Sequence, residues 1–109
     1  MRKLSLDAVA REQLKNAKEN SNQRSAKTVY GGHEHVLRQS VIALAAGAVM
    51  ADHLSPGEAT LYVLQGRVRL TSGKDSWDCR IGDLLDVPDE RQSVLALEPS
   101  VVLLTVAKP

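Results

Sequence analysis

The side chains best suited to chemistry in this chain are its three histidines, His33, His35 and His53. Imidazole nitrogens exchange protons near neutral pH and bind transition metals. His33 and His35 flank Glu34, and in an extended segment the period of two places both imidazoles on one face. Together with His53 they could hold a nickel, iron, manganese or zinc ion. The alternative, which the sequence favours, is that His33 and His35 lie at the surface or at an interface.

The direction of His35 depends on the strand that follows it. Either the odd-numbered residues 35–41 or the even-numbered residues 36–42 could face inward, and both sets contain polar side chains. The sequence leaves these two alternatives open.

The single cysteine, Cys79, has no Lys or His beside it that would lower its pKa. We therefore expect a buried and unreactive thiol. One cysteine excludes an intramolecular disulfide and a cysteine-rich metal site, and it is typical of a reducing cytoplasm. The chain starts without the apolar segment of a signal peptide and has no apolar run of roughly 18 residues, so we predict a cytoplasmic protein without a membrane partner.

The composition predicts one domain with an aliphatic core. The chain has 109 residues, no Phe, one Trp and two Tyr, so Leu, Val, Ile and Ala must fill the interior. Residues 1–30 carry seven basic and three acidic side chains, which leaves seven basic and ten acidic for the rest. No aromatic residues interleave with the basic ones, and a nucleic-acid partner is therefore not expected.

A helix is predicted from Leu6 to Asn20. Ser5 can cap it, and apolar residues at helical spacing, from Leu6 through Leu14 to Ala17, form one face. The polar segment that starts at Asn20 is interpreted as a linker or arm. We therefore expect a helix and arm over residues 1–26 and a β-barrel over residues 27–109.

From residue 28 the pattern changes to short apolar runs separated by Gly and Pro turns. The eight runs are 36–45, 49–54, 60–64, 67–71, 76–80, 84–87, 93–97 and 101–107. Short, evenly spaced strands without helical crossovers predict an all-β protein, an antiparallel jelly roll or barrel with one N-terminal helix.

Two motifs accompany these strands. The first runs from Gly47 through His53 to Gly66, and the second, GDLLDVP, runs from Gly82 to Pro88. In residue types and spacing they resemble the paired motifs of the cupin superfamily. The resemblance covers about residues 36–107 and implies an antiparallel double-stranded β-helix, the cupin form of the jelly-roll barrel.

The resemblance also marks the positions at which most cupins hold a metal. His53 matches the first ligand. Ser55 and Ala59 stand where a second His and a Glu or Gln are usual, and Gln92 or Ser93 stands at the last His position. A lone imidazole with neutral neighbours makes a weak metal site. We therefore expect a degenerate motif without a tightly bound metal, and a transition metal at His53 is the alternative.

The wall of the barrel interior follows from alternation. If Ala59 faces inward, Leu61 and Val63 do too, and Val68 and Leu70 complete the same face across the next turn. These side chains could line a small-molecule pocket together with His53, Ser55 and Gln92, or they could form an ordinary packed core.

The same alternation extends to the other strands. If His53 and Ser55 face inward, Val49 and Ala51 share their face. Trp77 and Tyr62 have polar tips, and both are predicted to lie on the outer face or in a subunit contact.

Three functions remain open from the sequence. The first is a barrel that binds a small organic molecule, as a sensing or regulatory module. The second is a metal-dependent enzyme of the dioxygenase, isomerase or decarboxylase type, which the resemblance implies, with an altered ligand set around His53. The third is a structural or interaction protein that has lost its site. A homodimer is expected in each case, because a small sandwich leaves strand edges exposed.

Overall fold

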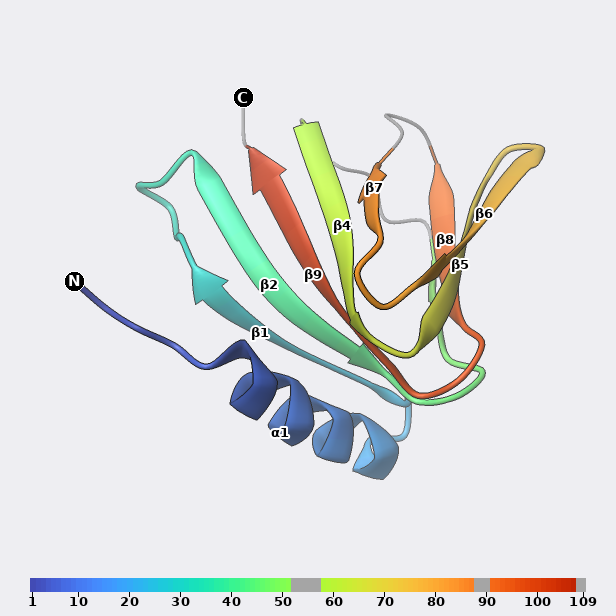
Figure 1. The fold of residues 1–109 in the computed structure, drawn as a ribbon, viewed down its shortest axis with the longest axis horizontal. Helices are drawn as coiled ribbons and strands as arrows, with labels where there is room; N and C mark the ends of the chain where they lie inside the picture. The colour runs from blue at the N-terminus through green and yellow to red at the C-terminus, as the bar shows by residue number, and fades with distance from the viewer. Residues whose placement is uncertain (52–57, 88–90, 108–109) are drawn as a thin grey trace.

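Two antiparallel sheets face each other, and one helix lies outside them (Figure 1). The computed structural model describes residues 1–51, 58–87 and 91–107. Within these residues a five-stranded sheet has the order β1-β2-β9-β4-β7 and a four-stranded sheet has the order β3-β8-β5-β6. The elements are α1 (Leu6–Glu19), β1 (Arg24–Tyr30), β2 (Leu37–Leu44), β3 (Val49–Ala51), β4 (Glu58–Gln65), β5 (Arg67–Ser72), β6 (Asp75–Arg80), β7 (Leu84–Asp86), β8 (Gln92–Ala96) and β9 (Ser100–Ala107).

The predicted all-β antiparallel jelly-roll barrel with one N-terminal helix is confirmed, and each of the eight expected strands is present. The predicted linker is wrong in part, because residues 24–30 form β1, which pairs antiparallel with β2. Its polar start hides the strand pattern in the sequence. The expected boundary between residues 26 and 27 consequently falls inside a strand.

Helix α1 begins and packs as its sequence predicts. The Ser5 Oγ accepts a hydrogen bond from the Ala8 amide at 3.2 Å, and the helix ends at Glu19, one residue before the predicted end. Its buried face, which includes Leu14 and Ala17, covers the outer face of the five-stranded sheet. No helix of residues 1–51, 58–87 and 91–107 is long and apolar enough to cross a membrane.

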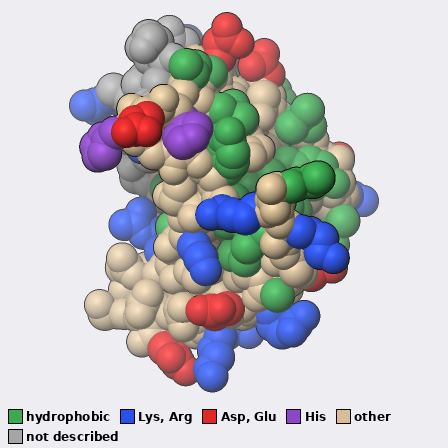
Figure 2. Space-filling model, turned by 90° about the vertical axis from the view of Figure 1, so that its left-hand side faces the viewer, with side chains coloured by type: hydrophobic (Ala, Val, Ile, Leu, Met, Phe, Trp, Pro, Cys, Tyr) green, Lys and Arg blue, Asp and Glu red, His purple; other side chains and the backbone are tan. Residues whose placement is uncertain are grey.

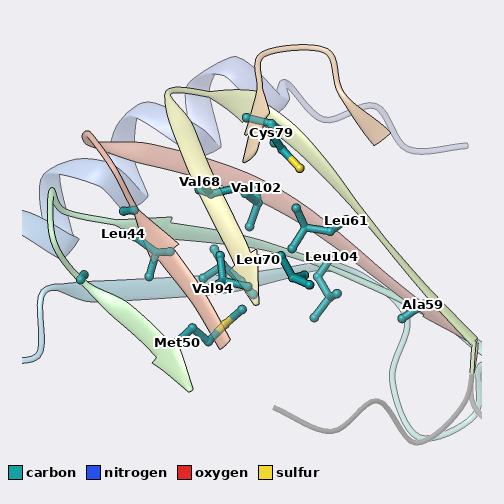
Figure 3. Packing of buried hydrophobic residues seen from close by; sticks show 14 of the residues in the cluster. Leu44, Met50, Ala59, Leu61, Val68, Leu70, Cys79, Val94, Val102 and Leu104 are labelled. Carbon is teal, nitrogen blue, oxygen red and sulfur yellow. The ribbon is translucent and has the colours of Figure 1, made fainter. Parts of the chain in front are cut away.

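The main core lies between the two sheets. Leu61, Val63, Val68 and Leu70 have at most 1% of their surface exposed, and they pack against aliphatic side chains of β2, β8 and β9 (Figure 3). Burying one such side chain stabilises the fold by about 1.5–3 kcal/mol. We call the side of each sheet that faces this core the inner face.

The turn between β4 and β5 requires a glycine. Gly66 has φ +82°, and a Cβ there would overlap the Ser100 Oγ and the Pro99 carbonyl oxygen. The Ser100 Oγ accepts a hydrogen bond from the Arg67 amide at 3.0 Å and is fully buried. The turn is therefore fixed to the start of β9.

The structure decides the open alternatives for β2. Ile42 and Leu44 belong to the core between the sheets, whereas Val41 and Ala43 pack with the α1 cluster. The even-numbered residues of this strand therefore form the inner face, and Gln39 shares the outer face with Val41.

Strand β3 has the opposite alternation from the expected one. Met50 is buried in the core, and Val49 is 47% exposed. The reason is pairing, because Met50 lies opposite the buried Val94 and cross-strand partners share a face. The expectation that Val49 faces inward is wrong.

Candidate ligand site on the inner face

The four positions that the cupin resemblance marks are only partly described. His53 and Ser55 lie outside the described residues. Ala59 and Gln92 are 5% and 6% exposed, and they lie on the inner faces of β4 and β8. The described part of the predicted ligand set therefore consists of a methyl group and a neutral amide.

Three of the predicted pocket residues lie deep in the interior. Leu61, Val63 and Val68 are almost completely buried and belong to the core cluster. They stabilise the barrel, and contact between these side chains and a ligand stays a prediction.

A polar row crosses the four-stranded sheet at the end where β8 begins. Ser72 lies opposite Gln92 on one side and Asp75 on the other. The Ser72 side chain is 2% exposed, and its Oγ donates a hydrogen bond to the Arg91 carbonyl oxygen at 3.2 Å. Buried polar side chains in such a row can orient the polar part of a small molecule. Ser72 was not predicted as a site residue from the sequence, because the strand period alone does not distinguish a polar inner position from a turn residue.

Trp77 lies beside this row, on the inner face. It pairs in register with the buried Leu70, and Cys79, two residues further along β6, is buried on the same face. The outer-face prediction for Trp77 is therefore wrong. Its indole is 39% exposed, and β6 is the edge strand of its sheet. The predicted burial of Cys79 would have identified the correct face, since the two residues have the same parity.

Cys79 has the properties of a structural thiol. It is 6% exposed, and burial raises the pKa of the thiol, with a further contribution from the carboxylates of Asp83 and Asp78. A thiol with a raised pKa is a poor nucleophile at neutral pH. The predicted inert cysteine agrees with this environment.

The two described histidines lie away from the inner face. His35 follows β1 in a turn, where its amide donates a hydrogen bond to the Gly32 carbonyl oxygen at 3.2 Å. Its ring and that of Tyr30 meet edge to face, with 5.3 Å between the ring centroids. Among residues 1–51, 58–87 and 91–107, no three His, Cys, Asp or Glu side chains lie close enough to hold a metal. The proposed His33/His35/His53 site stays a prediction, because His53 lies outside those ranges.

Ala59 and Gln92 do not fit the metal centre that the fold family implies. Ala59 has no donor atom, and the amide of Gln92 is a neutral oxygen donor where an imidazole is usual.

Comparison with known proteins shows the fold. Neither the protein-family models nor the curated proteins include a match to this chain. A solved structure of a conserved protein of unknown function from Streptococcus pyogenes matches with 25% identity and TM-score 0.72, covering 83% of this chain and 78% of that one.

Two other solved structures have a stated class or ligand. A cupin superfamily protein from Desulfitobacterium hafniense has 18% identity and TM-score 0.74, with 83% and 82% of the two chains covered. A variant of salicylate 1,2-dioxygenase from Pseudoaminobacter salicylatoxidans, in complex with gentisate, has 20% identity and TM-score 0.75, with 93% of this chain and 31% of that one covered. The chain has the cupin fold, and it spans about a third of the dioxygenase.

Proposed function

We propose that this protein binds a small organic molecule at the end of the inner face where β8 begins, and that it does so without a tightly bound metal. The observation that carries the proposal is Trp77, a 39%-exposed indole next to the polar row of Gln92 and Ser72 on an otherwise apolar face. An aromatic surface with a few buried polar groups is typical of small-molecule sites. The molecule would stack on the indole and place a polar group at the row.

The gentisate complex of the structurally similar dioxygenase suggests the first candidates for binding. We expect salicylate, gentisate or a related aromatic compound to raise the melting temperature, because a ligand that binds only the folded state stabilises it. The gain in the free energy of unfolding is about 2.7 kcal/mol when the free ligand concentration is about a hundred times Kd. Trp77→Leu should abolish the rise. Tyr62→Leu is the matched control, because Tyr62 is a 37%-exposed aromatic side chain on β4, pairing with Leu84 outside the core. Equal losses in both variants would contradict the proposed site.

The metal-free part of the proposal rests on Ala59 and Gln92. Elemental analysis of protein purified without added metal should find far less than one transition-metal ion per chain. The triple variant Ser55→His, Ala59→Glu and Gln92→His should gain nickel, iron or zinc affinity that the parent lacks, because it restores donors on an intact scaffold. Near-stoichiometric metal that disappears in His53→Ala would instead support the metal-dependent enzyme.

We also infer that the protein is a cytoplasmic homodimer with a sensing or regulatory role. The buried thiol of Cys79 suits a reducing compartment. Tyr62 and Leu84, which pair in register, are 37% and 66% exposed and form an apolar patch that a second copy would cover. Sedimentation should show a dimer that Tyr62→Asp together with Leu84→Asp dissociates. A monomeric parent at micromolar concentration would refute the dimer.

A further inference from the structure

A concavity lies on the outer side of the five-stranded sheet, where residues 1–5 pass the end of β1. It has a volume of about 580 Å³. Its polar side chains are Arg2, Tyr30, His35 and Gln39, and its apolar side chains are Leu4, Leu6 and Val29. We call it the arm groove. Figure 2 shows the left-hand side of the molecule as drawn in Figure 1, with histidine and acidic side chains close together near one corner and several Lys and Arg side chains below them.

Arg2 is fixed at one side of the arm groove. Its Nη2 donates a hydrogen bond to the Val29 carbonyl oxygen at 3.1 Å. A guanidinium carries five N–H donors in a planar fork, so this bond orients the group and leaves further donors for a ligand. Such a fork is suited to the two oxygens of a carboxylate.

Tyr30 and His35 also line the arm groove. Their rings meet edge to face, at 5.3 Å between centroids and 65° between planes. The chain can turn back between them because Gly31 has φ +94°, and a Cβ at Gly31 would overlap the Leu37 carbonyl oxygen. The position of the imidazole therefore depends on a turn that only glycine can adopt without strain.

The remaining lining residues are three apolar side chains and Gln39. Leu4, Leu6 and Val29 supply apolar surface. Gln39 lies opposite Tyr30 in register, and its Nε2 donates to the Thr105 Oγ1 at 3.2 Å. That bond leaves the Gln39 amide oxygen as an acceptor for a hydroxyl or amide of a ligand.

The charges decide the class of ligand. Among the described residues, those that line the arm groove include a guanidinium and an imidazole but no carboxylate, so the groove favours an anion over a cation or a neutral molecule. Its volume falls within the range of about 300–1,000 Å³ that is usual for small-molecule sites. We propose that the arm groove binds a small organic acid, with the carboxylate at Arg2 and His35 and an apolar or aromatic body over Leu4, Leu6 and Tyr30.

The arm groove is separate from the inner-face site, because the five-stranded sheet lies between its Gln39 side and the core. An organic acid bound in the arm groove would make the position of residues 1–5 depend on that ligand. Binding there and binding at Trp77 can be measured independently.

The test is titration of the full chain with phenylacetate, followed by amide NMR. Amide shifts are expected at Arg2, Tyr30 and His35, and phenylacetamide, the uncharged analogue, should bind at least about tenfold more weakly. Arg2→Gln keeps a long polar side chain and should weaken phenylacetate binding about tenfold. Arg11→Gln is the matched control, because Arg11 is an exposed arginine of α1 outside the groove, and it should leave the affinity unchanged.

Three outcomes would overturn the proposal. They are an absence of shifts around Tyr30 at millimolar phenylacetate, equal affinities of the parent and Arg2→Gln, or shifts confined to the neighbourhood of Trp77. The last outcome would support the inner-face site alone. Because Arg2 precedes the helix and contacts one carbonyl group, Arg2→Gln should keep the parent melting temperature, which checks that the variant is folded.

Discussion

The two sheets differ in what covers their outer faces. In β5, of the four-stranded sheet, exposed or half-exposed residues alternate regularly with buried ones, whereas the last four residues of β2, Val41–Leu44, are all buried. Helix α1 covers the outer face of β2 and β9, and the outer face of β5 and β6 carries the exposed Arg69–Asp78 ion pair. The difference shows that a strand covered on both sides, such as β2, loses the polar alternation that identifies its inner face.

The same contrast bears on function. The inner side chains of the five-stranded sheet belong to the core. In the part of the chain that the structure describes, the four-stranded sheet has no helix on its outer face and ends in the edge strand β6, which holds Trp77 beside the row of Ser72 and Gln92. A ligand can reach an edge strand without opening the core, so we place the proposed site on the four-stranded sheet.

The largest expected effect on stability comes from the inner face of the five-stranded sheet. Leu61→Ala should lower the free energy of unfolding by about 2–5 kcal/mol, because it removes a fully buried side chain and leaves a cavity. Urea unfolding measures this loss. Thr60→Ala, one residue away on the outer side, is the control, and a loss as large as that of Leu61→Ala would contradict the assignment of the two faces.

The helix-covered outer face should rank next. Leu14→Ala removes a side chain that is 8% exposed and packs in the cluster between α1 and the sheet, and it should cost about 2 kcal/mol, the lower end for leucine truncations. Leu14→Met preserves most of the volume and should cost about 1 kcal/mol or less. If Leu14→Ala unfolds like the parent, the helix does not contribute to the core as described.

The helix cap should contribute less than either core. Ser5→Ala removes the acceptor for the Ala8 amide and should cost about 1 kcal/mol. Ser5→Asp keeps a capping oxygen and should restore most of the stability. Thermal unfolding distinguishes these variants, and equal melting temperatures for all three proteins would show that the cap is not formed in solution.

The smallest effect belongs to the solvent-exposed outer face. The Arg69 Nε donates to the Asp78 carboxylate at 2.7 Å, and this hydrogen bond lowers the pKa of Asp78. The stabilisation is therefore present above the ordinary Asp pKa of about 4 and is lost as the pH falls through the lower folded value. Asp78→Asn should remove this pH dependence, and high salt should reduce it in the parent. A parent and variant with identical stability at every pH would mean that the pair contributes nothing.

The fold could be predicted because turn glycines and period-two runs are local signals. Gly66 and the alternation of β5 identified the inner positions of that strand, Val68 and Leu70, correctly. Strand β1 could not be predicted, because its polar residues become a strand only by pairing with β2. The direction of β2 could not be predicted either, since it depends on coverage by a helix that is distant in the sequence.

The candidate site was predictable only in part. The spacing of the cupin motifs located Ala59 and Gln92 on the inner face. Trp77 and Ser72 were missed, because which face they occupy is fixed by cross-strand register with Leu70 and Gln92. Register depends on pairing between segments and is not written in either strand alone.

The most direct test of the proposed metal-free ligand site is a crystal structure of the protein purified without chelator and soaked with the compound that raises its melting temperature most. We expect electron density for an organic molecule that contacts Trp77 and the polar row of Gln92 and Ser72, and no anomalous peak at the iron, nickel or zinc edge inside the barrel. An anomalous peak on the inner face would contradict the metal-free account. Density for the compound only on the outer faces would contradict the site.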